Sequence, residues 1–106
     1  MNLIELISYF RLDGDQEEFF LSNSLDPESE VIEVYMERPF DISKEIKFFE
    51  IETTEGNLEF EYNNVKYFNL FDFYFFADFI EESKSKLDLS DKEFAVILLN
   101  YSINDT

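Results

Sequence analysis

The chain of 106 residues contains no cysteine and no histidine. Without cysteine it has no disulfide, no thiolate nucleophile and no cysteine-ligated metal. Without histidine it cannot build a Ser-His-Asp or Cys-His catalytic arrangement. Its only glycines are Gly14 and Gly56, so no glycine-rich loop can hold a phosphate group. We therefore predict a protein that is not an enzyme and that uses no cofactor.

Long apolar segments are missing as well. No run of 18 or more apolar residues is available to cross a membrane. The segment from Met1 to Phe10 lacks the basic region and the small-residue cleavage site of a signal peptide, which predicts a cytoplasmic protein. Aromatic residues nevertheless make up 19% of the chain, enough to build a core. We therefore predict one folded domain covering residues 1–106.

Basic residues are scarce relative to acidic ones. Eight Lys and Arg stand against 25 Asp and Glu, which gives a formal net charge of −17. This charge repels nucleic acids and anionic membranes, because both require basic surfaces. The acidic turn from Asp13 does not match a calcium-binding EF-hand loop, because Glu18 and Ser24 occupy the positions that require glycine and glutamate. The sequence therefore predicts no metal site and a partner that is a basic protein.

Apolar residues recur at helical spacing in three segments. We predict helices at residues 3–12, 69–84 and 91–102. The third helix would begin with the capping box Ser90-Asp91-Lys92-Glu93. A buried strand is its alternative, because Ala95 to Leu99 is a continuous apolar run. If that segment is helical, the residues expected to point inward are Phe94, Ile97, Leu98 and Tyr101.

Alternating or apolar segments predict four strands, at residues 30–37, 46–54, 57–62 and 65–68. Glu55-Gly56 and Asn63-Asn64 would form the turns of two successive hairpins. The predicted class is α+β, a small antiparallel meander with the helices packed on one face. The residues expected on that covered face are Phe49, Ile51, Leu58, Phe60, Tyr62, Val65 and Tyr67. The second hairpin would pair Tyr62 with Val65, Glu61 with Lys66 and Phe60 with Tyr67.

The first predicted hairpin would place like charges opposite each other. In the register that pairs apolar residues, Glu52 faces Glu59 and Glu50 faces Glu61. Such pairs destabilise a sheet, so Glu52→Gln should stabilise the free protein. A cationic partner would relieve the repulsion. We therefore predict a partner-binding acidic face formed by these four residues, with Glu33 as a neighbour.

The predicted helix 69–84 carries a second candidate surface. Phe71, Phe75 and Phe79 recur every four residues on the side away from its main apolar face. The acidic residues that flank them are Asp72, Asp78 and Glu82. Two interpretations stay open. The strip is buried against another helix, or it is an aromatic anchor with an acidic rim that suits a basic partner.

Small size, the absence of cysteine, extreme acidity and the composition of an AT-rich genome together resemble the immunity proteins of bacterial toxin systems, including contact-dependent growth inhibition. The resemblance is one of overall character and carries over no functional residue. It implies an antitoxin, expected here as a monomer, that binds a nuclease toxin domain and blocks its active site. The alternatives are an inhibitor that mimics nucleic acid, of the anti-restriction or anti-CRISPR type, and an acidic secretion chaperone, which would be a dimer.

Overall fold

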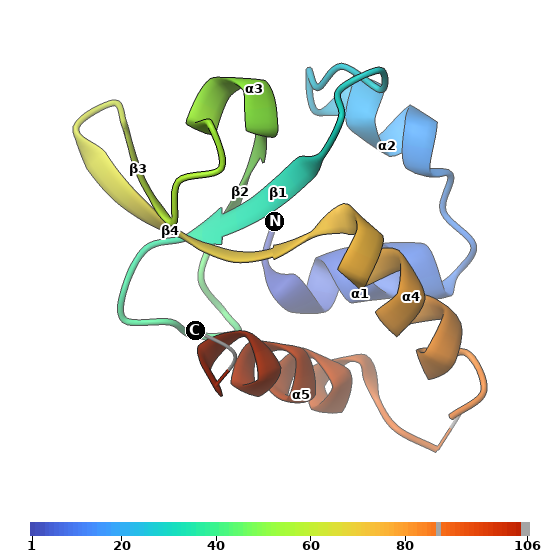
Figure 1. Cartoon of the computed structure of the whole chain (residues 1–106). Coiled ribbons are helices and arrows are strands. Elements are labelled where there is room, and N and C mark those ends of the chain that lie inside the picture. Colours follow the sequence, from blue (N-terminus) through green and yellow to red (C-terminus); the bar gives the residue numbers. More distant parts are fainter. Residues whose placement is uncertain (87, 105–106) are drawn as a thin grey trace.

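The computed structural model describes residues 1–86 and 88–104, without the side chain of residue 104. The chain has an α+β fold in which helices pack against a curved antiparallel sheet of strand order β2-β1-β4-β3 (Figure 1). This confirms the predicted α+β class, but the sheet is not the predicted meander, because β1 lies between β2 and β4. The strands are β1 (Ile32–Met36), β2 (Ile46–Glu50), β3 (Glu59–Tyr62) and β4 (Val65–Asp72). The helices are α1 (Leu3–Arg11), α2 (Gln16–Ser22), α3 (Ile51–Thr54), α4 (Phe73–Ser83) and α5 (Asp91–Asn104).

Side-chain caps fix where the helices begin. In the predicted capping box of α5, the Ser90 hydroxyl accepts from the Glu93 N–H at 3.1 Å and the Glu93 carboxylate accepts from the Ser90 N–H at 3.0 Å. Residues 91–102 are therefore helical, and the strand alternative is wrong. The sequence pattern after Asp15 is ambiguous and predicts neither helix nor strand. In the structure this segment forms α2, and the Asp15 carboxylate caps it by accepting from the Glu18 N–H at 2.8 Å.

The hairpin from β3 to β4 has the predicted turn and the predicted pairing. Asn63 and Asn64 both have positive φ, 52° and 67°, as the tight type I′ turn requires. Tyr62 pairs with Val65, Glu61 with Lys66 and Phe60 with Tyr67. Strand β4 then continues to Asp72, so the first four residues of the predicted helix 69–84 are strand.

The other predicted hairpin does not form. After β2 the chain turns into the short helix α3, and Glu55 and Gly56 follow it with φ of 58° and 75°. Residues with a left-handed backbone conformation end helices as readily as they form hairpin turns. Glu55 and Gly56 therefore end α3 here and do not form a hairpin turn. Strand β2 pairs with β1 instead, with Ile32 opposite Glu50 and Met36 opposite Ile46.

Helices α1, α4 and α5 lie together on one side of the sheet (Figure 1), whereas the short helix α3 lies against the other face, where Thr54 donates to Glu33. Strand β1 lies at the centre and is buried along its whole length, not half-buried as its alternation predicted. From the strands, the residues that reach the main core, under α1, α4 and α5, are Ile32, Val34, Met36, Ile46, Leu70 and Phe71. Leu70 and Phe71 are adjacent in sequence yet share the core, because a bulge interrupts the β1–β4 pairing at this point.

The aromatic residues expected under the helices lie on the opposite face. Tyr35, Phe49 and Tyr67 form a second, smaller cluster, against which Phe60 and Val65 pack. Leu58 is 70% exposed. The predicted assignment of the covered face was therefore wrong. The missing hairpin is the reason, because β2 takes its orientation from β1 and not from β3.

Candidate functional site

The acidic face predicted on the sheet is dispersed in the structure. Glu33 is only 9% exposed, and its carboxylate accepts hydrogen bonds from the Thr54 hydroxyl at 3.0 Å and the Asn69 amide at 2.9 Å. Because both oxygens are engaged inside the fold, Glu33 is not available to a partner. It joins β1 to α3 and β4.

Glu50 and Glu52 hold the turn that precedes β1. The Glu50 carboxylate accepts from the Asp26 N–H at 2.7 Å. The Glu52 carboxylate accepts from the Ser29 hydroxyl at 2.5 Å and from the Glu30 N–H at 3.1 Å. The Ser29 hydroxyl and then the Glu30 N–H hold the pKa of Glu52 below its ordinary value, because they stabilise the charged carboxylate.

Glu59 and Glu61 are exposed on the edge strand β3. Neither faces another glutamate. Glu61 lies opposite Lys66, and Glu59 lies opposite Phe68 while its carboxylate pairs with the Lys66 ammonium at 3.3 Å. The predicted like-charge pairs Glu52/Glu59 and Glu50/Glu61 therefore do not exist, and the argument that they await a cation fails.

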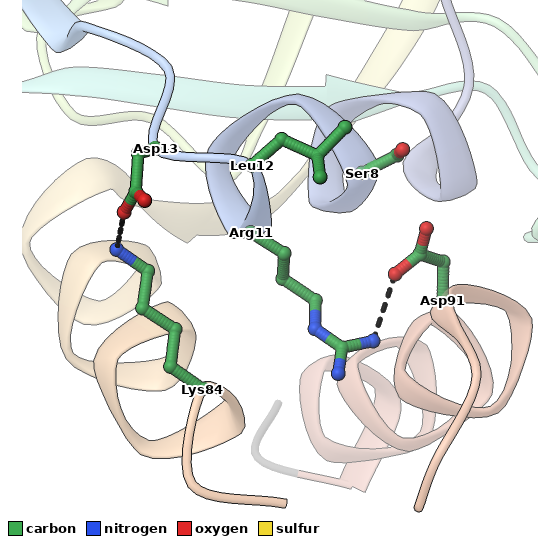
Figure 2. Close-up of a pocket in the computed structure, with 6 residues that line it drawn as sticks. All are labelled: Ser8, Arg11, Leu12, Asp13, Lys84 and Asp91. Carbon is green, nitrogen blue, oxygen red and sulfur yellow. Dashed lines mark hydrogen bonds and ion pairs between the residues drawn. The ribbon is translucent and has the colours of Figure 1, made fainter. Parts of the chain in front are cut away.

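A charged hollow of about 480 Å³ lies where the ends of α1, α4 and α5 meet. Figure 2 shows two ion pairs across it, Arg11 with Asp91 at 2.8 Å and Lys84 with Asp13 at 2.7 Å. The hydrogen bond to Asp13 raises the pKa of Lys84 above its ordinary value. Each cation is already matched by a carboxylate, so the charged hollow offers no excess charge to a ligand.

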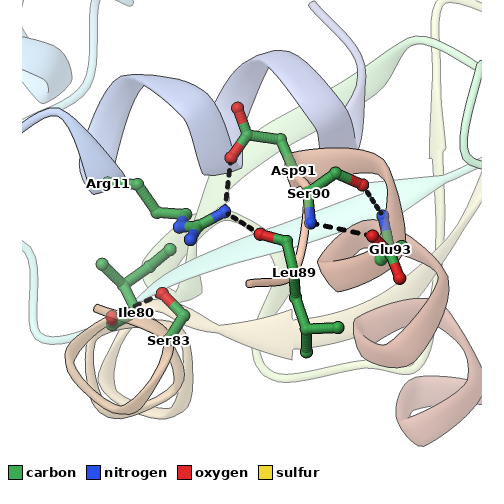
Figure 3. Close-up of polar contacts among 7 residues, drawn as sticks. All are labelled: Arg11, Ile80, Ser83, Leu89, Ser90, Asp91 and Glu93. Carbon is green, nitrogen blue, oxygen red and sulfur yellow. Dashed lines mark hydrogen bonds and ion pairs between the residues drawn. The ribbon is translucent and has the colours of Figure 1, made fainter. Parts of the chain in front are cut away.

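Arg11 links two distant parts of the chain in this hollow. Its Nη1 also donates to the Leu89 carbonyl at 3.1 Å (Figure 3), and its guanidinium lies 4.6 Å from the centre of the Phe94 ring. The residues of the pair with Asp91 are 80 positions apart, so no local sequence pattern could have indicated it. The arrangement fastens the end of α1 to the start of α5.

A second hollow, the α4–α5 groove, has a volume of about 300 Å³ and a largely apolar lining. Its lining residues are Phe75, Asp78, Phe79, Glu82, Ser83, Lys86, Leu89, Phe94, Ile97 and Tyr101. Four of the predicted site residues, from the aromatic strip and its flanks, meet here. The other two do not. Phe71 is buried in β4 and stacks on Phe76, and Asp72 caps α4 by accepting from the Phe75 N–H at 2.8 Å.

Four aromatic rings from the two helices form a continuous row along the groove. Tyr101 stacks on Phe75 with centroids 4.7 Å apart and an interplanar angle of 18°. Phe75 lies 6.4 Å from Phe79, whose ring meets Phe94 nearly at a right angle, 5.9 Å away. Phe75 and Phe79 therefore pack on α5, as the first interpretation of the predicted strip expected. They also line an open groove, and the second interpretation, an anchor for a partner, stays a prediction.

Two α5 residues in the groove are more exposed than their predicted inward orientation implied. Ile97 is 46% exposed and Tyr101 is 50% exposed, whereas Phe94 and Leu98 are buried. A signal for this was present in the sequence. The apolar run of α5 is too continuous for one buried face, so some of its members had to remain at the surface.

Acidic side chains flank the apolar lining. Asp78 and Glu82 are both exposed on α4, one turn apart. The Glu82 carboxylate lies 3.6 Å from the Lys86 ammonium, a weak surface pair. Among the described residues, Asp78 has no hydrogen-bond or ion-pair partner. The groove thus combines exposed aromatic surface with incompletely neutralised negative charge.

The described part of the chain contains no cluster of three or more His, Cys, Asp or Glu side chains placed to hold a metal ion. It also contains no helix with the length and apolarity that a membrane crossing needs.

Comparison with known proteins adds no assignment. No family model matches the sequence, and neither the curated proteins nor the solved structures include a significant match. The geometry of the α4–α5 groove and the charge of the chain are therefore the features from which a function can be inferred.

Proposed function

We propose that this protein is an immunity protein, an antitoxin that binds and neutralises a basic toxin domain of the nuclease type. The observation that supports the proposal is the α4–α5 groove, where the exposed Tyr101 and the partly buried Phe75 and Phe79 lie beside the carboxylates of Asp78 and Glu82. Aromatic anchors surrounded by polar groups are typical of the centre of a protein interface.

The net charge of −17 favours a basic partner for this groove. Nuclease domains bind the phosphate backbone and therefore present basic surfaces. A strongly acidic protein attracts such a surface during encounter and competes for it with nucleic acid. In this mechanism an apolar side chain of the toxin enters the groove, while neighbouring Lys or Arg side chains meet the carboxylates.

The nucleic-acid mimic loses the observation that supported it. That alternative depended on a regular array of paired glutamates across two strands, and β2 and β3 are not neighbours in the sheet. Glu33, Glu50 and Glu52 are also occupied by hydrogen bonds within the chain. The groove, by contrast, suits a protein surface with an apolar side chain to insert.

A pair of adjacent residues on α5 allows a matched test. Ile97 lines the groove and Val96 does not, although the two are exposed to a similar extent, 46% and 41%. Ile97→Lys would place a cation in the groove, and Val96→Lys would add the same charge outside it. Each variant should be expressed together with the C-terminal domain of the protein encoded immediately upstream, and cell growth and binding should be measured.

The unaltered chain is expected to protect cells that express this upstream domain. Ile97→Lys should weaken binding by roughly a hundredfold, as loss of a central interface anchor does, and should abolish protection. Val96→Lys should bind within about threefold of the unaltered chain and should still protect the cells, since changes outside the interface core have small effects. Absence of protection by the unaltered chain would contradict the antitoxin function, and equal effects of the two variants would remove the groove from the interface.

A further inference from the structure

The aromatic row of the α4–α5 groove carries an arginine of the chain itself at its Phe94 end, the closed end, and among the described residues no arginine at its Tyr101 end, the open end. We infer that the open end recognises an arginine side chain of the partner, whose guanidinium stacks on Tyr101 and pairs with the carboxylate of Asp78. This inference rests on the proposed function and names the side chain that the acidic groove selects.

The closed end shows the arrangement in full. The Arg11 guanidinium lies over the ring of Phe94 at 4.6 Å, and its Nη1 donates to Asp91 at 2.8 Å. The ring meets the flat face of the guanidinium, while the Asp91 carboxylate and the Leu89 carbonyl accept from its Nη1. Phe94 is also the last ring of the aromatic row, so this arginine completes the row at that end.

The second arginine of the chain follows the same preference. Arg38 lies over Phe68 at 4.1 Å and over Phe40 at 5.6 Å from the ring centroids. Both arginines present in the sequence are therefore placed on phenylalanine rings. Rings and carboxylates are abundant in this chain, and arginine is the cation that uses both of them.

Tyr101 supplies the unoccupied ring at the open end of the row. Phe75 covers one of its faces in a stacked contact, and yet half of the Tyr101 side chain is exposed. Because Phe75 covers only one face, the exposed area of Tyr101 lies on the rest of the ring. A planar cation can stack on this exposed part of the ring.

Asp78 supplies the carboxylate. It lines the same groove as Tyr101, is exposed, and has no ion-pair partner among the described residues. Glu82 lies one turn further along α4 and is held only by the weak pair with Lys86, at 3.6 Å. A guanidinium can pair with a carboxylate while it stacks on a ring, whereas the ammonium of lysine is a compact charge that cannot stack in this way.

The test uses two small cationic probes, N-acetyl-arginine methylamide and N-acetyl-lysine methylamide. Their binding is followed by NMR through the ring resonances of Tyr101 and Phe75. The arginine probe should shift these resonances and bind at least about threefold more tightly than the lysine probe, the size of an exposed cation–π contact. Asp78→Asn should weaken the arginine probe.

Tyr101→Leu and Tyr101→Phe form the matched pair of variants. The first removes the ring from a half-exposed position, and the second keeps it. Tyr101→Leu should reduce binding of the arginine probe to that of the lysine probe, while Tyr101→Phe should preserve the difference. Equal binding of the two probes, or an arginine preference that survives in Tyr101→Leu, would overturn the inference.

Failure of this inference is distinguishable from failure of the proposed function. If the arginine probe shows no preference but Ile97→Lys still abolishes toxin binding, the groove binds its partner without selecting arginine. If the probe binds as expected but Ile97→Lys leaves toxin binding intact, the arginine site exists and the proposed toxin interface is elsewhere.

Discussion

Two groups of carboxylates in this acidic chain differ in what they already bind. The bonded carboxylates Glu33, Glu50 and Glu52 accept hydrogen bonds from other parts of the chain. The groove carboxylates Asp78 and Glu82 are exposed, and within the described part of the chain Glu82 makes one weak ion pair, with Lys86, while Asp78 makes none. A bonded carboxylate contributes to the fold, so only the groove group is free to contribute to an interface. The net charge does not distinguish the two groups.

Removal of a buried bonded carboxylate should have the largest effect on stability. Glu33→Ala would leave the Thr54 hydroxyl, which is 1% exposed, and the Asn69 amide without their acceptor. Unsatisfied buried donors cost about 1–3 kcal/mol, so urea unfolding should show a loss of about 2–3 kcal/mol. Binding of a partner by the folded protein should not change. A loss below about 0.5 kcal/mol would show that the hydrogen bonds to Glu33 do not stabilise the fold.

The next largest effect is expected at the charged hollow. Asp91→Ala would leave Arg11, whose side chain is 13% exposed, without its carboxylate. Loss of one partner costs about 3–5 kcal/mol in a fully buried pair. Asp91 itself is partly exposed, so we expect about 1–2 kcal/mol in thermal or urea unfolding. Asp88→Ala, which removes the same charge from an exposed position, is the control and should change stability by less than about 0.5 kcal/mol.

Sequence patterns could predict what depends on neighbouring residues. The turn at Asn63-Asn64 has few uses other than a tight hairpin, and its strands pair in the predicted register. Glu55-Gly56 provides left-handed residues too, but these also end a helix, and here they follow α3. The pairing of β2 with β1 could not be predicted, because the residues of neither strand indicate which strand it pairs with.

The candidate site was predictable to a similar degree. The spacing of Phe75 and Phe79 on one side of a helix, with Asp78 between them, indicated that these residues lie together, and all three line the groove. The other half comes from α5, and its contribution depends on how two helices pack. The stack of Tyr101 on Phe75 joins residues that are far apart in sequence, so periodicity within either helix could not reveal it.

The bonded carboxylate Glu52 should have a smaller, pH-dependent effect. Its pKa is held low by the Ser29 hydroxyl and the Glu30 N–H, so it stabilises the fold above the ordinary glutamate pKa of about 4.3. This contribution is lost as the pH falls through the lower pKa of the folded state. Glu52→Gln should therefore destabilise the protein slightly at pH 7, and the difference should vanish at low pH. Melting curves at several pH values test this expectation, which reverses the stabilisation predicted from like-charge pairing.

The groove carboxylates should have the smallest effect on folding and a clear effect on binding. The double variant Asp78→Asn, Glu82→Gln lowers the net charge from −17 to −15 and should change stability by less than about 0.5 kcal/mol. Association with the basic partner should slow by roughly threefold to tenfold at low salt, and the difference should shrink as salt is added.

The control for this double variant removes two charges elsewhere. Glu59→Gln, Glu61→Gln changes the net charge equally on the edge strand β3, away from the groove. If attraction is local to the groove, the control should slow association less than the groove variant does, because the field of an exposed charge is screened over about 10 Å at 0.1 M salt. Equal slowing by both double variants in stopped-flow measurements would mean that only the total charge attracts the partner. The distinction between bonded and groove carboxylates would then describe the fold and not the binding site.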